Sequence, residues 1–241
     1  MPADRFFIDS PLNPSSLDLS GTEFHHLAHV MRLRPGQKLE LVNGQGAFAE
    51  AEVLAIHRDH AELKILSHTT SLPPPHSLIL SLAMTRPSAL EWTVEKATEL
   101  GVTHLWIFPG EKSDKPTLSP SQESRLRTIL VSALKQCGRL FLPTLDIRPP
   151  LSEWTPPTGS LFFGDLSPQA PHLKGPFSDP VIFFMGPEKG FSPAELEILT
   201  HTFHAQGISL HENTLRAETA ALSALSQYHL LRTTDGVKNS L

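Results

Sequence analysis

The first part of the chain alternates apolar and polar positions in short runs, a pattern typical of half-buried β-strands. Four runs show it: RFFID, KLELVN, FAEAEVLAIH and HAELKIL. Asn43-Gly44, between the second and third runs, indicates a hairpin. One short helix is predicted within GTEFHHLAHVMRLRPGQ, ended by Pro35 and Gly36. The pattern therefore predicts a small β-barrel over residues 1–70.

The pattern changes after SLPPPHS, residues 71–77, because three consecutive prolines continue neither a helix nor a central strand. From residue 78 to 241, short apolar strands alternate with helical stretches, as in a parallel α/β sheet. The expected strands are LILSLAM, HLWIFP, LDI, SLFFG, VIFFM and GISL. The helix signals are a capping box of Ser88 and Glu91 with a stop at Gly101, a start at Ser119-Pro120 with a stop at Gly138, and a last helix from about Leu215 to Arg232.

The stretch GPEKGFSPAELEIL, residues 186–199, joins a stiff loop to a well-marked helix start. Ser192 is the expected cap, Pro193 suits the first turn, and Glu195 completes a capping box. The loop before them is not needed for the cap, so it is the first candidate site. Ligands of such sheets bind at the carboxyl ends of strands, where GDLSPQ and HENTLRAET also lie. Neither GxGxxG nor Walker A occurs in these loops, so no dinucleotide or nucleoside triphosphate is indicated.

The composition of the chain excludes few classes of protein. With 39% hydrophobic and 19% charged residues, the chain is typical of a globular protein, and its start predicts no signal peptide. The apolar runs are too short to cross a bilayer, so we expect a cytoplasmic protein. Cys137 is expected to be a packing thiol, and the pair His25 and His29 favours no metal site. A net charge of −5 makes no general case for nucleic acid.

Several motifs together resemble one family. GPEKGFSPAE resembles its GPEGGFS-x-x-E loop, and SLHENTLRAETAALSAL resembles its SLG-x-RILR-x-ETA-x-x-AL segment. VEKATELGV, ALKQCGRLFLP, RFFI and HHLAHVMRLRPGQ match further stretches in the right order. The chain thus resembles the bacterial 16S ribosomal RNA (uracil-N3)-methyltransferases of the SPOUT superfamily over nearly its whole length.

The resemblance implies a PUA-like β-barrel that binds RNA (1–70), a proline-rich linker (71–77) and a knotted parallel α/β SPOUT methyltransferase domain (78–241). It implies S-adenosylmethionine as cofactor, a homodimer, and 16S rRNA or the assembled small ribosomal subunit as substrate, with no metal and no membrane. The implied cofactor-binding residues are Gly164, Met185, Gly186, Pro187, Glu188, Gly190, Ser209, Leu210, His211, Leu215, Thr219 and Ala220.

The reaction removes the N3 proton of uracil while the base attacks a methyl group, so charge on the base must be stabilised. Arg216 is the candidate for that role, through O2, O4 or a flanking phosphate, and Glu218 for orienting Arg216 or shaping the pocket. The general base stays open between Glu188, Glu218 and solvent. The candidate RNA-binding residues are Arg5, Arg32, Arg34, Lys38 and Arg139.

The sequence departs from the family pattern at Lys189 and His211, where glycine is usual, and at Asn213, where arginine is usual. His211 would be strained if that position needs a positive φ. Two alternatives stay open: a related SPOUT enzyme acting on another rRNA or tRNA base, and a non-catalytic RNA-binding protein with a degenerate cofactor loop. The identity of the target uridine is also open.

Overall fold

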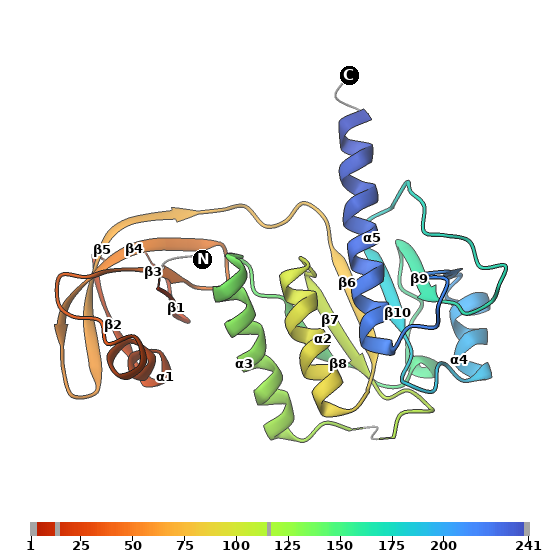
Figure 1. Ribbon diagram of the computed structural model, residues 1–241, viewed down its shortest axis with the longest axis horizontal. Helices are drawn as coiled ribbons and strands as arrows, with labels where there is room; N and C mark the ends of the chain where they lie inside the picture. Colours follow the sequence, from red (N-terminus) through yellow and green to blue (C-terminus); the bar gives the residue numbers. More distant parts are fainter. Residues whose placement is uncertain (1–3, 13–14, 115–116, 239–241) are drawn as a thin grey trace. The chain divides into compact units, whose positions relative to one another are not determined.

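The computed structural model describes residues 4–12, 15–114 and 117–238 (Figure 1). It divides into two compact units. One contains the chain up to Pro74 together with Val131–Leu142, and the other contains Pro75–Leu130 and the chain from Pro143 onward. The boundary between Pro74 and Pro75 falls inside the proline run. The long helix α3 (Pro120–Cys137) contributes to both units.

The first unit is built on one five-stranded sheet in the order β1-β3-β4-β5-β2, with β1 parallel to β3 and the other pairs antiparallel. The strands are β1 (Arg5–Phe7), β2 (Ser16–Ser20), β3 (Lys38–Val42), β4 (Ala47–Ile56) and β5 (His60–Thr70). Four of them follow the predicted runs. The strand β2 was not predicted, although its SLDLS pattern alternates, because two leucines are a weak signal.

The alternation of these strands builds the core of the first unit, since every second residue of a strand faces the same side. Leu39 and Leu41 of β3 and Ala51 and Val53 of β4 are buried together with Leu63 of β5. The predicted hairpin joins β3 to β4: Oδ1 of Asn43 accepts from the backbone N–H of Gln45 and of Ala47, at 2.9 and 3.0 Å.

The predicted helix of this unit is present but ends differently. α1 (Gly21–His25) runs directly into a π-helical turn, η1 (His26–Met31). The prediction that Pro35 and Gly36 end it was wrong, because Arg32 adopts a left-handed conformation with φ of 56° and its N–H bonds the Leu27 carbonyl. The chain therefore leaves the helix three residues before the proline.

The second unit is a six-stranded parallel sheet in the order β11-β9-β10-β6-β7-β8. All six predicted strands are present: β6 (Leu78–Ala83), β7 (His104–Phe108), β8 (Thr144–Ile147), β9 (Ser160–Gly164), β10 (Val181–Met185) and β11 (Gln206–Ile208). The two central strands, β10 and β6, are buried at every position, as their mostly apolar sequences favour, and Ser81 is the one polar residue among them.

Alternate residues of β10 separate the two faces of this sheet. Phe183 packs edge-on against Tyr228 of α5 (Ala217–Lys238), which also contacts α2 (Pro87–Glu99). On the other face Phe184 lies in one cluster with Trp154, which follows η2 (Leu151–Glu153), and with Phe203, which follows α4 (Pro193–Glu197) and η3 (Ile198–Thr202). Both faces are thus covered, which leaves the strand ends as the place for a site.

The observed helix boundaries agree with some of the predicted start and stop signals and disagree with one. Gly101 and Gly138 follow α2 and α3 with φ of +83° and +82°, so both predicted stops are confirmed. The capping box of Ser88 and Glu91 was wrong. α2 begins at Pro87 after the N-cap residue Arg86, with no side-chain cap from within the helix, and Glu91 instead lies 3.3 Å from Nε of Arg125. Among the described helices, none is long and apolar enough to cross a membrane.

Candidate active site

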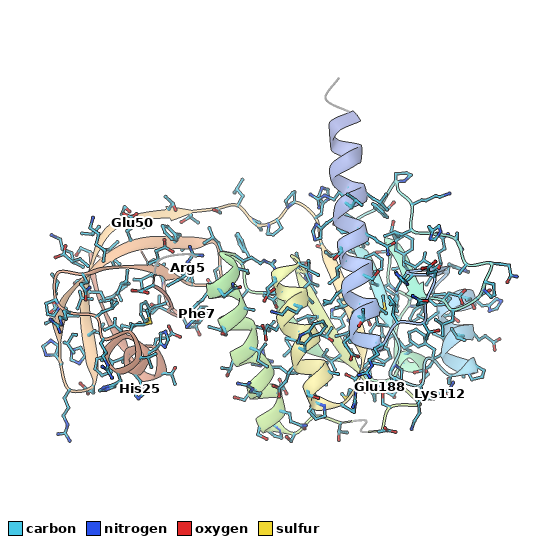
Figure 2. The ribbon with its side chains drawn as sticks, viewed as in Figure 1. Arg5, Phe7, His25, Glu50, Lys112 and Glu188 are labelled. Carbon is cyan, nitrogen blue, oxygen red and sulfur yellow. The ribbon has the colours of Figure 1, made fainter. Side chains whose placement is uncertain are left out.

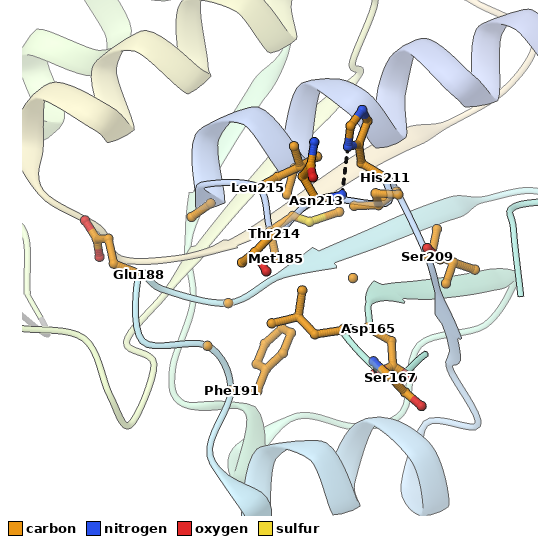
Figure 3. A pocket seen from close by; sticks show the side chains of 18 of the residues that line it. Asp165, Ser167, Met185, Glu188, Phe191, Ser209, His211, Asn213, Thr214 and Leu215 are labelled. Carbon is orange, nitrogen blue, oxygen red and sulfur yellow. Dashed lines mark hydrogen bonds between the residues drawn. The ribbon is translucent and has the colours of Figure 1, made fainter. Parts of the chain in front are cut away.

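A pocket of about 660 Å³ lies at the carboxyl ends of β9, β10 and β11 (Figure 3). The three loops that follow these strands form its walls, as expected for an open parallel sheet. Eleven of the twelve residues predicted to bind the cofactor line it, and Thr219 does not. The eleven are Gly164, Met185, Gly186, Pro187, Glu188, Gly190, Ser209, Leu210, His211, Leu215 and Ala220.

The loop after β10, residues 186–191, forms the second of these three walls. We call it the cofactor loop, because the motif resemblance implies that it binds the cofactor. The N–H of Gly190 donates to the Pro187 carbonyl at 2.8 Å, and Gly190 has φ of +69°. A Cβ on Gly186 would lie 3.0 Å from the backbone N of Phe191, so the loop folds back tightly on its own start. Phe191 is buried against Phe163, and it also lines the pocket. The two glycines are therefore needed for this turn.

The helix cap after this loop is the predicted capping box of Ser192 and Glu195, and Glu195 has a further role. Oγ of Ser192 accepts from the Glu195 N–H at 3.0 Å, and Oε2 of Glu195 accepts from the Ser192 N–H at 2.8 Å. The second oxygen, Oε1, accepts from the backbone N–H of Glu111 at 3.0 Å. Glu195 is only 3% exposed, so one buried carboxylate satisfies donors on two loops.

The third wall, after β11, bears two of the three departures from the family pattern, His211 and Asn213. Nδ1 of His211 accepts from the Asn213 N–H at 3.0 Å, the bond dashed in Figure 3. His211 is not among the described residues with positive φ, so it does not have the strain that a positive φ would cause. The Leu210 carbonyl accepts from Nε2 of Gln227 and Oγ of Ser223, which fastens this wall to α5.

The first wall, after β9, contributes more than the sequence indicated. GDLSPQ was a candidate loop, but only Gly164 was selected from it. Asp165 lines the pocket, its Oδ1 accepts from the Ser167 N–H at 2.9 Å, and its Oδ2 packs over Gly207, where a Cβ would approach to 2.6 Å. Further lining residues that were not selected are Leu166, Ser167, Pro168, Lys189, Phe191, Leu196, Ile208, Glu212, Asn213, Thr214 and Ala217.

Glu188 is held at the start of α2. Its Oε1 accepts from the backbone N–H of Arg86 at 3.1 Å and from Nε of Arg86 at 3.3 Å. Burial alone would raise the pKa of Glu188, but the hydrogen bonds and positive charge of Arg86 outweigh it and leave the pKa below its usual range. A more acidic carboxyl group is a weaker proton acceptor, so this position suits a structural contact better than a general base.

Arg216 and Glu218 lie at the beginning of α5, beside the pocket but not among its lining residues. The Arg216 side chain is exposed, and within the described part of the chain no group bonds its guanidinium. Glu218 is half-buried, and its Oε2 has no hydrogen-bond partner among the described residues. Both groups thus have bonding capacity left for a substrate.

The candidate RNA-binding residues belong to the first unit, but they differ in environment. Arg32, Arg34 and Lys38 are exposed. Arg5 is not: Figure 2 shows it on β1, and its guanidinium is bonded to Glu40. Burial lowers the pKa of Arg139 below the usual range of arginine. The five candidates therefore divide into three exposed cations and two partly covered ones.

The ionisable side chains bear on metal binding and on the charge of the ligand that the pocket favours. Within residues 4–12, 15–114 and 117–238, no group of three or more His, Cys, Asp or Glu side chains is placed to hold a metal ion. The pocket wall carries three carboxylates, Asp165, Glu188 and Glu212, and one lysine, Lys189. Glu188 is paired with Arg86 and Lys189 with Asp114, which leaves two carboxylates without a cationic partner among the described residues. Such a wall favours a ligand with net positive charge over a phosphate.

The comparisons with known proteins assign the family. Residues 72–229, more than half of the chain, match the model of the RNA methyltransferase domain, and residues 19–66 match the model of the RNA methyltransferase PUA domain. The chain belongs to this RNA methyltransferase family. The family inferred from its motifs is thereby confirmed, and so is the α/β fold class with a PUA-like domain ahead of the parallel sheet.

Individual relatives cover nearly the whole of this RNA methyltransferase. It is 27% identical to "Ribosomal RNA small subunit methyltransferase E" of Rickettsia conorii, over 96% of this chain and 97% of the relative. The Bacillus subtilis protein of that name is 25% identical over 90% and 92%. A crystal structure of the Neisseria gonorrhoeae enzyme of that name, bound to S-adenosyl methionine, is 25% identical, covers 95% of this chain and 98% of its own, and has a TM-score of 0.84.

Proposed function

We propose that this RNA methyltransferase transfers a methyl group from S-adenosylmethionine to N3 of one uridine in the 16S rRNA of the small ribosomal subunit. The observation that carries the proposal is the pocket formed by three loops at the strand ends, lined by the residues of the family motifs. Its support is the family match together with relatives named for the small ribosomal subunit. The substrate base is the expectation from the motif resemblance.

The residues of the pocket fit the cofactor. A volume of about 660 Å³ lies within the range of small-molecule sites. The tight turn closed by Gly186 and Gly190 provides a thin backbone wall against which a flat ring system can lie. Two carboxylates of the wall, Asp165 and Glu212, have no cationic partner among the described residues, and they favour a sulfonium cation. When bound, S-adenosylmethionine supplies the methyl group as an electrophile; Gly186, Leu210 and Leu215 are among the residues that would hold it.

The proposed catalytic residues, Arg216 and Glu218, lie at the start of α5. Arg216 is proposed to contact the uracil or its phosphate, where its guanidinium stabilises the charge on the base after N3 loses its proton. Glu218 is proposed to orient Arg216 or to shape the pocket wall. With Glu188 committed to Arg86, the candidates for accepting the N3 proton are Glu218 and solvent.

The remaining expectations concern partners and location. The PUA-like unit is proposed to bind the rRNA through Arg32, Arg34 and Lys38, because exposed cations are available to phosphates. We also propose a homodimer that needs no metal and a cytoplasmic location. Leu230 of α5 and Trp92 of α2 stay 65% and 43% exposed, which supports a partner on these neighbouring helices.

The decisive experiment is transfer of a labelled methyl group to small ribosomal subunits that lack the modification, followed by identification of the modified nucleoside. We expect 3-methyluridine at one position of 16S rRNA. A different methylated nucleoside, or activity on tRNA alone, would support the related SPOUT enzyme instead. A protein that binds rRNA but shows no calorimetric signal with S-adenosylmethionine would be the non-catalytic alternative.

A further inference from the structure

The loop that follows β7, residues 109–114, is bonded to the cofactor loop and its cap at three points. We call it the support loop. Nζ of Lys112 donates to the Phe191 carbonyl at 2.8 Å, and Nζ of Lys189 lies 2.5 Å from Oδ1 of Asp114. The third contact is the bond from the Glu111 N–H to Glu195. None of these three support-loop residues lines the pocket, although their partners stand in or directly behind its wall.

The support loop is itself held in place. Oγ of Ser113 donates to the Met84 carbonyl at 2.6 Å, directly after β6. A Cβ on Gly110 would lie 3.0 Å from Cβ of Ala83 and 3.4 Å from Cδ of Pro187, so the two loops are in close contact there. The position of the support loop is therefore set by the central sheet.

The three contacts differ in how strongly they hold the cofactor loop. Lys189 and Asp114 have side chains that are 63% and 69% exposed, and exposed ion pairs contribute little. Glu195 has a second role in the α4 cap. The Lys112 ammonium has no polar partner among the described residues other than the Phe191 carbonyl, and a charged donor makes a stronger hydrogen bond than a neutral one.

Phe191 is the residue through which this bond acts on the pocket. Its buried ring lines the pocket, and its backbone N packs against Gly186 at the other end of the cofactor loop. We propose that Lys112 is a positioning residue: by holding the Phe191 carbonyl it keeps the cofactor loop closed in the shape that binds the cofactor. The identity of the ligand rests on the proposed function; the mechanical role of Lys112 does not.

The test uses the full chain with three substitutions. Lys112→Met removes the donor and keeps the length of the side chain, whereas Lys112→Arg keeps a charged donor. Lys96→Met is the matched control, because Lys96 on α2 also has its ammonium bonded, to Glu95 and Glu99, but does not line the pocket. Calorimetry with S-adenosylmethionine is expected to give about fivefold weaker binding for Lys112→Met, the loss of one partly exposed charged hydrogen bond.

A second measurement separates positioning from general destabilisation. Hydrogen exchange of residues 186–192 in the ligand-free protein should become faster in Lys112→Met and stay unchanged in Lys112→Arg and Lys96→Met. The proposal is overturned if exchange and affinity are both unaffected by Lys112→Met, or if Lys96→Met changes them equally. Failure of the unaltered protein to bind S-adenosylmethionine would contradict the proposed function, while the exchange comparison would still decide the role of Lys112.

Discussion

The guanidinium of Arg5 is bonded to a single carboxylate oxygen of Glu40, with Nε at 2.8 Å and Nη2 at 2.6 Å from Oε2. The two side chains are 11% and 22% exposed, and the guanidinium also lies 5.6 Å from the ring centre of Phe48. The pair joins β1 to β3, the one parallel pair of the first unit's sheet. A residue expected to contact RNA therefore has a structural partner, and the two roles make different predictions.

We expect Arg5→Ala to lower the free energy of unfolding by about 1–3 kcal/mol, because the partly buried carboxylate of Glu40 loses its partner. Arg34→Ala is the matched control, since its side chain is exposed, and we expect a change within about 0.5 kcal/mol. Urea denaturation measures both. If Arg5→Ala keeps full stability and loses RNA binding, the RNA contact is the main role of Arg5.

The exposed cations should act through phosphates. Arg34→Ala is expected to weaken binding to small-subunit RNA and to flatten the dependence of log K on log salt by about one unit for each lost phosphate contact. Arg32 is better replaced by glycine, because its φ of 56° would strain alanine. Filter binding at several salt concentrations is the measurement. An unchanged slope in both variants would show that Arg32 and Arg34 do not contact RNA phosphates.

Arg216→Ala should reduce the turnover of methyl transfer by about 10²-fold or more, as for the loss of one charge-stabilising donor. Cofactor affinity should stay near normal, because Arg216 does not line the pocket. Arg127→Ala, which removes an exposed arginine paired with Glu123 on α3, is the control for loss of charge. A collapse of cofactor binding in folded Arg216→Ala protein would show that Arg216 shapes the pocket instead.

The contact of Glu188 with Arg86 predicts a pH dependence of stability. The pKa of Glu188 is lower in the folded protein than its ordinary value of 4.5, so its contact stabilises the fold above pH 4.5. That contribution is lost as the pH falls through the lowered folded-state pKa.

Glu188→Gln should therefore be less stable than the unaltered protein at pH 7, and the difference should close below about pH 4.5. Denaturation at a series of pH values measures it, with Glu212→Gln as a second carboxylate of the same pocket wall. A difference that is constant across this pH range would mean that the charge of Glu188 contributes nothing.

The sequence by itself determined the features that depend on near neighbours. The mostly apolar runs of β6 and β10 favoured burial on both faces, and Ser192 with Glu195 specified a helix start within four residues of chain. Gly101 and Gly138 marked helix ends because a positive φ is cheap only for glycine. With the strand ends located in this way, the three candidate loops followed, and eleven of the twelve residues selected from the family motifs line the pocket.

Only the tertiary structure decided which distant groups meet. Arg86 and Glu188 are 102 residues apart, so no local rule could replace the expected capping box of α2 with this contact. Lys112 acts on Phe191 across 79 residues, and Arg5 is bonded to Glu40 across 35. Capping and periodicity describe interactions within a few turns of chain, whereas side-chain partners over such separations exist only after the sheets have brought their loops together.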